Sequence, residues 1–124
     1  PAIEDSGVDI LMGIGGAPEG VIAAVALKCL GGEIQGRLKF RNDDEKQRAR
    51  KMGITDLNKK FSMDELVKGN EAMFAATGVT DGTILKGVQF LSHGAKTHSI
   101  VMRAKTKTVR FVEARHSFEH FPDY

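Results

Sequence analysis

The sequence has little of several features that mark particular classes of protein. It has one cysteine and no tryptophan, and 18 lysines and arginines against 16 aspartates and glutamates leave a formal net charge of only +2. That charge is too small to indicate nucleic-acid binding by bulk electrostatics. The longest apolar run, Val21–Leu27, is far shorter than the roughly 20 residues that cross a bilayer. The sequence also shows no Ser-His-Asp arrangement, Cys-x-x-Cys pair, coiled-coil heptad or internal repeat.

Cys29 is the only cysteine, so no disulfide can form within this chain and a reducing compartment fits best. We interpret it as a small buried apolar side chain of a helix. A reactive thiol is disfavoured, because a cysteine flanked by Leu27, Lys28 and Leu30 has no neighbour arranged to lower its pKa.

A glycine-rich loop is the most distinctive feature that is present. Residues Val8–Leu30 join an apolar run to an apolar helix through a loop that contains Gly13, Gly15 and Gly16. Glycine permits a close backbone approach that a side chain would block, and Pro18 suits the first helical turn, where its missing N–H is no loss. The pattern predicts a ligand-binding strand, loop and helix. The free N–H groups at the helix N-terminus would attract an anion such as phosphate.

Glu19 places a carboxylate in the same first turn. A carboxylate and a phosphate repel each other unless a divalent cation such as magnesium or manganese takes oxygen ligands from both. The helix dipole alone would also explain this glutamate, since acidic residues are favoured in a first turn. The glycines do not decide between the two interpretations, because their spacing matches neither the Gly-x-Gly-x-x-Gly dinucleotide pattern nor a P-loop.

Four segments of the chain resemble one known family. They are GIGGAPEGVIAAVALKCLGGE, RKMGITD, FAATGVTDG and TKTVRFVEARHS. With them the chain resembles, nearly from end to end, the class II fructose-1,6-bisphosphatases of the lithium-sensitive phosphatase superfamily. The resemblance implies hydrolysis of the 1-phosphate of fructose 1,6-bisphosphate to fructose 6-phosphate in gluconeogenesis, with Mn²⁺ or Mg²⁺ as cofactor and a cytoplasmic location. Some relatives also take sedoheptulose 1,7-bisphosphate.

Carried over residue by residue, the resemblance implies that Glu19 is a metal ligand and that Gly16 contacts the substrate through its backbone, with Gly15 and Ala17 beside it. It assigns no catalytic group in this chain. The family's other metal-binding acidic residues belong to an amino-terminal portion without a counterpart here, and the chain starts at Pro1 without an initiator methionine. We therefore expect a carboxy-terminal portion that is incomplete for catalysis alone, and a complete enzyme that is a homo-oligomer.

The resemblance also implies the fold, a layered α/β sandwich with a mixed sheet, like the C-terminal domain of the lithium-sensitive phosphatases. The 124 residues, 41% of them hydrophobic, suffice for one core, so we expect a single α/β domain over residues 1–124. Residue patterns predict helices over Pro18–Leu30, Asp43–Met52 and after the capping-box candidate Ser62–Glu65, and strands over Ile34–Phe40, Glu71–Ala76, Ile84–Leu91, Thr97–Ala104 and Thr108–Ala114. The last strands are expected to be antiparallel, with a hairpin at Lys105–Lys107. The first helix is apolar all round and should be covered on most sides.

Other polar groups have both a functional and a structural interpretation. The Thr77–Gly82 loop follows a predicted strand and can approach the glycine-rich loop in an open α/β sheet, but its threonines can equally satisfy turn backbone groups. Asp81 in that loop is a conceivable metal ligand that nothing in the sequence matches to a site. Arg37 and Lys39 alternate with apolar residues, so we interpret them as the solvated face of a strand, although Arg37 is long enough to reach a phosphate.

The histidines and the basic end of the chain are interpreted structurally. His116 and His120 have a spacing of four that suits a metal only in a helix, and the aromatic tail around them favours docking or fraying at the terminus. His93 and His98 flank Gly94, and a general-acid role for His98 has no visible partner. We interpret the last basic residues as charged strand edges, with an anionic effector or a subunit contact as alternatives. They are Arg103, Lys105, Lys107, Arg110 and Arg115.

The main competing hypothesis is a noncatalytic module whose glycine-rich loop captures a phosphorylated metabolite without turnover. A third is an assembly element whose apolar helix forms an interface. Acidic metal-binding motifs in the gene's upstream sequence would favour the phosphatase, whereas an unrelated partner domain there would favour the binding module.

Overall fold

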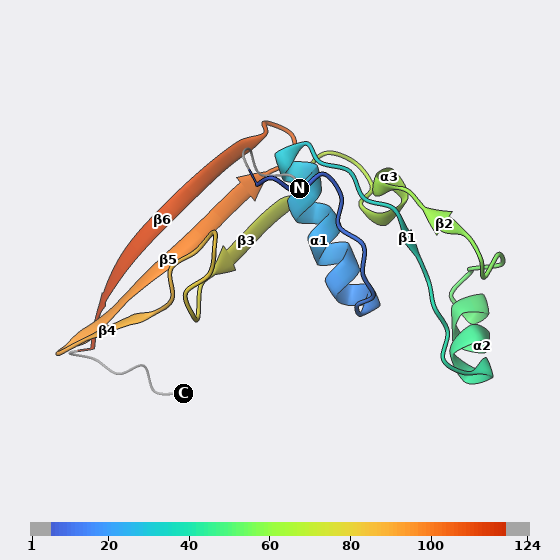
Figure 1. Ribbon diagram of the computed structural model, residues 1–124, viewed down its shortest axis with the longest axis horizontal. Helices are drawn as coiled ribbons and strands as arrows, with labels where there is room; N and C mark the ends of the chain where they lie inside the picture. The colour runs from blue at the N-terminus through green and yellow to red at the C-terminus, as the bar shows by residue number, and fades with distance from the viewer. Residues whose placement is uncertain (1–5, 119–124) are drawn as a thin grey trace.

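The computed structural model describes residues 6–118, in which helices and strands are mixed along the chain. Helix α1 (Ala17–Leu30) lies between a four-stranded sheet on one side and a smaller unit of short strands and helices on the other (Figure 1). The predicted α/β class is therefore confirmed. The predicted helix over Pro18–Leu30 is α1 itself, and Gly31 ends it in the left-handed conformation with φ of 80°. Within residues 6–118, no helix combines the length and the hydropathy of a membrane span.

The larger sheet is built around one long strand. Strand β5 (Gly94–Arg103) pairs along its whole length with β6 (Thr108–Ser117), while β3 (Met73–Thr77) and β4 (Gln89–Leu91) pair with its two halves. These pairings are antiparallel, as expected for the last strands of the chain. The turn Ala104–Lys107 joins β5 to β6, and Lys107 adopts a positive φ of 52° in it. The hairpin predicted from the sequence is thus confirmed.

The smaller unit contains the pair β1 (Gly36–Arg37) and β2 (Lys60–Phe61) together with α2 (Asp43–Lys51) and α3 (Met63–Leu66). Helix α2 begins where the side chain of Asn42 accepts a hydrogen bond from the Glu45 N–H at 3.0 Å. Its acidic first turn and basic last turn complement the helix dipole. These features confirm the predicted charged helix.

Two predicted strands are shorter in the structure than the residue patterns indicated. The alternating segment Ile34–Phe40 pairs only at Gly36–Arg37, because its partner β2 is itself two residues long. The segment Ile84–Leu91 pairs only over Gln89–Leu91, since its first half forms a turn in which the Gly82 N–H donates to the Leu85 carbonyl. Alternation of side chains indicates an extended backbone, but hydrogen bonding to a neighbour decides how much of it is a strand.

The strand predicted ahead of the glycine-rich loop is wrong for this structure. Residues 6–16 form no strand and run beside α1 in Figure 1. Four of the apolar side chains in this segment are 72–83% exposed, namely Ile10, Leu11, Met12 and Ile14, and Val8 is 44% exposed. A strand requires a hydrogen-bonding neighbour, and none of the strands described within residues 6–118 pairs with this segment.

The core is divided between the two faces of α1. On one face, Cys29 packs with Ile100 and Met102 of the large sheet. On another, Ala24 packs with Met63 and Val67 around α3. The prediction that α1 is covered on most sides holds for these two faces, whereas Val21 and Ile22 on the remaining surface are 42% and 57% exposed. Cys29 is fully buried, and burial raises the pKa of its thiol, which agrees with the structural interpretation.

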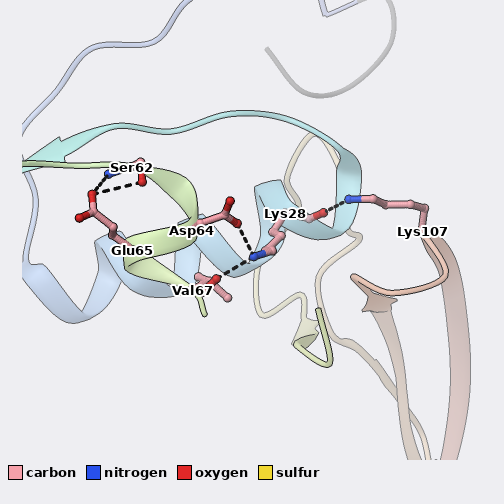
Figure 2. A network of polar contacts seen from close by, with 6 residues as sticks. All are labelled: Lys28, Ser62, Asp64, Glu65, Val67 and Lys107. Carbon is pink, nitrogen blue, oxygen red and sulfur yellow. Dashed lines mark hydrogen bonds and ion pairs between the residues drawn. The ribbon is translucent and has the colours of Figure 1, made fainter. Parts of the chain in front are cut away.

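A buried lysine connects α1 to α3. Lys28 is only 7% exposed, and its Nζ donates to Asp64 Oδ1 at 2.9 Å and to the Val67 carbonyl at 2.7 Å (Figure 2). The backbone carbonyl of Lys28 in turn accepts a hydrogen bond from Lys107 Nζ, which comes from the β5–β6 turn. The side chain and backbone of one residue therefore bind α1 both to α3 and to the sheet.

Candidate functional site

The glycine-rich loop ends at the N-terminus of α1. Gly16 is the residue that caps the helix, with an extended backbone (φ −67°, ψ 151°), and Pro18 lies in the first turn. The first helical hydrogen bond runs from the Gly20 N–H to the Gly16 carbonyl at 3.0 Å. The N–H groups of Ala17 and Glu19 precede this bond, so they have no partner within the helix. Backbone donors and the positive end of the dipole thus face the same space.

The carboxylate of Glu19 lies directly over Gly16. A Cβ placed on Gly16 would be 2.0 Å from Oε2 of Glu19 and 2.9 Å from its Cδ. The turn geometry causes this proximity, because the third helical residue reaches back to the residue that caps the helix. Both residues are exposed. A negative oxygen and the loop backbone are therefore presented together to a ligand approaching from solvent.

Glu19 is a suitable ligand for a divalent cation but is not a complete metal site. Hard cations such as Mg²⁺ take about six oxygen ligands, and a carboxylate is the side chain they prefer. In the part of the chain that the structure describes, no group of three or more His, Cys, Asp or Glu side chains is placed to hold a metal ion. The remaining ligands of any cation at Glu19 must come from outside residues 6–118, from substrate or from water.

The Thr77–Gly82 loop lies toward the same end of α1 as the glycine-rich loop, because β3 and α1 run in opposite directions (Figure 1). Two of its polar side chains have hydrogen-bond partners within the chain. Thr77 Oγ1 and Ser99 Oγ share a hydrogen bond of 2.8 Å, and Asp81 Oδ1 accepts the Gly87 N–H at 2.9 Å. The carboxylate of Asp81 therefore closes its own loop, which supports the structural interpretation of this segment.

His98 and His116 also have structural partners. His98 accepts the Lys86 N–H through Nδ1 at 3.0 Å, and its ring stacks on Phe111 with the ring centroids 5.6 Å apart. His116 lies in β6, not in a helix, and its Nε2 is 3.0 Å from Thr97 Oγ1 in a hydrogen bond. His120 lies outside the described residues. A metal site at His116 and His120 would require His116 to lie in a helix, and it lies in a strand instead.

Several basic residues near the β5–β6 turn are paired within the chain. Arg103 and Lys105 donate to the two carboxylate oxygens of Glu71 at 3.1 and 2.6 Å. Lys105, followed by Arg103, holds the pKa of Glu71 below its usual value. Lys107 is bound to the Lys28 carbonyl. These contacts explain part of the basic character of the chain's end without an external anion.

One feature of the surface was not singled out by the residue patterns. A hollow of about 440 Å³ lies between α2 and the segments on either side of it. Its lining residues are Leu38, Lys39, Phe40, Lys46, Arg50, Leu57 and Asn58. The sequence signal for it is the excess of basic residues in the range 37–60, which we interpreted as the solvated faces of a strand and a helix.

Comparison with known proteins identifies the family. The chain matches the family model described as bacterial fructose-1,6-bisphosphatase, glpX-encoded, over residues 1–116. It is 42% identical over 123 residues to the D-fructose 1,6-bisphosphatase class 2/sedoheptulose 1,7-bisphosphatase of Synechococcus sp. (strain JA-3-3Ab), with 90% of this chain and 35% of that protein aligned. It is also 42% identical over 130 residues to enzyme 2 of the same name from Acaryochloris marina (strain MBIC 11017), with 95% of this chain and 37% of that protein aligned.

The chain therefore spans little more than a third of the length of these relatives. The matched range contains the whole glycine-rich loop, α1 and all of the sheet except the last residue of β6. This match agrees with the motifs that carry the resemblance in the sequence. The chain belongs to the family of bacterial, glpX-encoded fructose-1,6-bisphosphatases.

Proposed function

We propose that the complete enzyme is a metal-dependent fructose-1,6-bisphosphatase to which this chain contributes one metal ligand, Glu19. The reaction is hydrolysis of the 1-phosphate of fructose 1,6-bisphosphate to fructose 6-phosphate. The observation that carries the proposal is the position of the Glu19 carboxylate over Gly16, beside the first N–H groups of α1, which have no partner within the helix. A carboxylate and anion-binding donors at one place are what a cation bridging protein and phosphate requires.

In this proposal the residues of the loop bind and orient the substrate. Gly15, Gly16 and Ala17 present backbone to the sugar bisphosphate, and the absence of a side chain on Gly16 leaves room for the Glu19 carboxylate. The N–H groups of the first turn and the helix dipole stabilise negative charge that develops on the phosphate oxygens as water attacks. A divalent cation, when bound, polarises phosphorus and activates the attacking water.

The assignment of a particular substrate and a particular metal goes beyond what the comparisons support. The relatives' names include both fructose 1,6-bisphosphate and sedoheptulose 1,7-bisphosphate phosphatase activity. We assign the first as the main substrate, Mn²⁺ or Mg²⁺ as the metal, and the cytoplasm as the location. A homo-oligomer is supported by the exposed apolar residues of α1, Val21 and Ile22, which a second copy or the rest of the enzyme can cover.

Phosphate release from fructose 1,6-bisphosphate tests the proposal. The full-length gene product and this chain are compared with Mg²⁺, with Mn²⁺ and with a chelator. Release by the full-length product alone, abolished by the chelator, is the expected result. If neither sample is active, the proposal is contradicted and a noncatalytic module that binds phosphorylated metabolites is favoured. If this chain alone is active, the assignment of the remaining metal ligands to another part of the enzyme is contradicted.

Glu19→Gln in the full-length product tests the residue itself. Glutamine keeps the size of the side chain but removes the charge that a divalent cation requires, so metal-dependent turnover should fall at least tenfold. Glu33→Gln is the matched control, because Glu33 is an exposed glutamate just beyond the other end of α1. A fully active Glu19→Gln enzyme excludes Glu19 as a metal ligand.

A further inference from the structure

The hollow beside α2 combines positive charge with an apolar surface. Three of its lining side chains are cationic, namely Lys39, Lys46 and Arg50, and Asn58 adds an amide. The other lining residues are apolar and half-buried, and they are Leu38, Phe40 and Leu57. None of these residues belongs to the glycine-rich loop. Its volume of about 440 Å³ is in the usual range for small-molecule sites, roughly 300–1,000 Å³.

The positive charge of the chain is concentrated in the segment that contains the lining residues of this hollow. The range 37–60 contains nine lysines and arginines against four aspartates and glutamates, an excess of five positive charges. The complete sequence has a net charge of only +2, so the rest of the chain is negative overall. An anion near the protein is therefore attracted toward this unit in preference to the remainder of the surface.

The cations of the hollow are incompletely neutralised by the chain itself. Lys46 Nζ donates to Asp43 Oδ1 at 2.7 Å, and Arg50 is close enough to help lower the pKa of Asp43. Among the residues that the structure describes, no ion pair involves Lys39, and Arg50 has no carboxylate within the 4 Å of a salt bridge. Of the three cations, only Lys46 thus has an ion-pair partner among the described residues, and that carboxylate, Asp43, is 86% exposed to solvent.

We propose that this hollow is a binding site for a small phosphorylated anion, separate from the site at Glu19. The guanidinium of Arg50 can bind two phosphate oxygens with parallel hydrogen bonds, while Lys39 supplies a mobile point charge. The Asn58 amide can donate to a further oxygen. Leu38, Phe40 and Leu57 contact the apolar or sugar portion of the ligand. The volume of the hollow matches that of a small molecule.

Isothermal titration calorimetry with sodium pyrophosphate tests this site in the full-length enzyme. The titration is done with EDTA, so that no divalent cation holds phosphate at Glu19, and at 0.15 M salt, where charges more than about 8 Å apart are largely screened. Lys39→Gln and Arg50→Gln should each weaken binding by about tenfold, because each loses a charge-assisted hydrogen bond. The double variant should show no measurable binding.

Arg48→Gln is the matched control, because it removes the same charge from α2 but does not line the hollow. It should change the affinity less than twofold, and Glu19→Gln should bind pyrophosphate like the wild type. The proposal is overturned if Arg48→Gln weakens binding as much as Arg50→Gln, if Lys39→Gln and Arg50→Gln both bind normally, or if Glu19→Gln abolishes binding. A failure of the hydrolysis assay leaves this result intact, since the titration uses no substrate and no metal.

An acidic macromolecule is tested in the same experiment. A 12-nucleotide single-stranded DNA is titrated into the wild type and the double variant, with circular dichroism confirming that both are folded. Binding of the DNA more tightly than pyrophosphate, lost in the double variant, would assign the basic surface to nucleic acid and overturn the small-molecule proposal. Weaker binding of DNA, unchanged in the double variant, supports it.

Discussion

Glu19 occupies the space that a side chain on Gly16 would fill, since a Cβ at Gly16 would lie 2.0 Å from Glu19 Oε2. The backbone of Gly16 does not itself require glycine, because its φ of −67° and ψ of 151° suit any residue. The reason for a glycine at this position is therefore the carboxylate above it. The glycine-rich loop and the Glu19 carboxylate therefore form one arrangement, because the carboxylate can lie above Gly16 only where Gly16 has no side chain.

Gly16→Ala should impair catalysis while leaving the fold intact. The new methyl group displaces the Glu19 carboxylate, and the contact is relieved cheaply because the displaced atoms are the end of a flexible side chain. We expect at least a tenfold fall in metal-dependent phosphate release by the full-length enzyme and a rise in the metal concentration needed for half-maximal activity. The melting temperature should change by only a few degrees.

The control for this variant is Gly20→Ala. Gly20 lies in α1, and a Cβ there meets nothing within 4 Å. Alanine should stabilise the helix by up to about 1 kcal/mol and leave turnover unchanged. A Gly16→Ala enzyme as active as Gly20→Ala would show that the position of Glu19 over the loop is unimportant for the reaction.

Lys28→Met should destabilise the protein more than Asp64→Asn. Methionine fills a similar space but leaves the Val67 carbonyl without the donor that now lies 2.7 Å away, at a cost of about 1–3 kcal/mol. Asp64 is 87% exposed, so water replaces much of what its carboxylate provides and the expected loss is below about 1 kcal/mol. Chemical denaturation measures both free energies of unfolding. A loss for Asp64→Asn equal to that for Lys28→Met would place the stabilisation in the ion pair.

The elements that were predicted correctly are those whose signals are local. Helix α1 follows from an apolar run after Pro18, and α3 follows from the Ser62–Glu65 pattern, where the Glu65 carboxylate accepts the Ser62 N–H at 3.0 Å. The strands over residues 34–40 and 84–91 were predicted too long, and a strand before the loop was predicted where none forms. The length of a strand depends on hydrogen bonds to a neighbour that is distant in the sequence. The side-chain pattern of one segment contains no information about that neighbour.

Part of the candidate site was predicted correctly because its signal is also local. Pro18, Glu19 and the glycines are contiguous, so a local pattern places them at one helix N-terminus. Two other features bring together residues from separate segments. They are the contacts of Lys28 with its two partners and the cluster of Lys39 with Arg50. Lys28 was visible only as an interruption in an apolar run, and the sequence does not say which group compensates a buried charge.

The capping contact at Glu65 should make stability depend on pH in the acid range. The hydrogen bond from Lys59, and then that from the Ser62 N–H, lower the pKa of Glu65 from 4.5 to about 2. A carboxyl with a lowered pKa in the folded state stabilises the protein fully above its unfolded pKa, and this contribution is lost as the pH falls from 4.5 toward 2. The difference in melting temperature between wild type and Glu65→Gln should therefore shrink over that interval.

Lys59→Gln separates the two causes of this shift. It removes the larger contribution but keeps the Ser62 N–H, so the pKa of Glu65 should rise partway, and the loss of stability below pH 4.5 should be smaller and complete at a higher pH. Thermal unfolding followed by circular dichroism between pH 6 and pH 2 measures the profile of each variant. Parallel profiles for wild type and Glu65→Gln would show that Glu65 does not stabilise the folded state through its charge.

Gly94→Ala should be among the most destabilising small substitutions in the sheet. A Cβ on Gly94 would lie 1.9 Å from the carbonyl oxygen of His116, and this oxygen belongs to the backbone of the paired strand β6. Backbone in a ladder cannot move without breaking hydrogen bonds, so we expect a loss of about 2–4 kcal/mol in the free energy of unfolding. Gly82→Ala is the control, because its nearest contact is an ordinary 3.6 Å from the Leu85 carbonyl. Urea denaturation of the two variants decides the matter: equal stabilities would mean that β5 and β6 separate easily at this end, and that the ten-residue pairing is not a rigid support for the rest of the sheet.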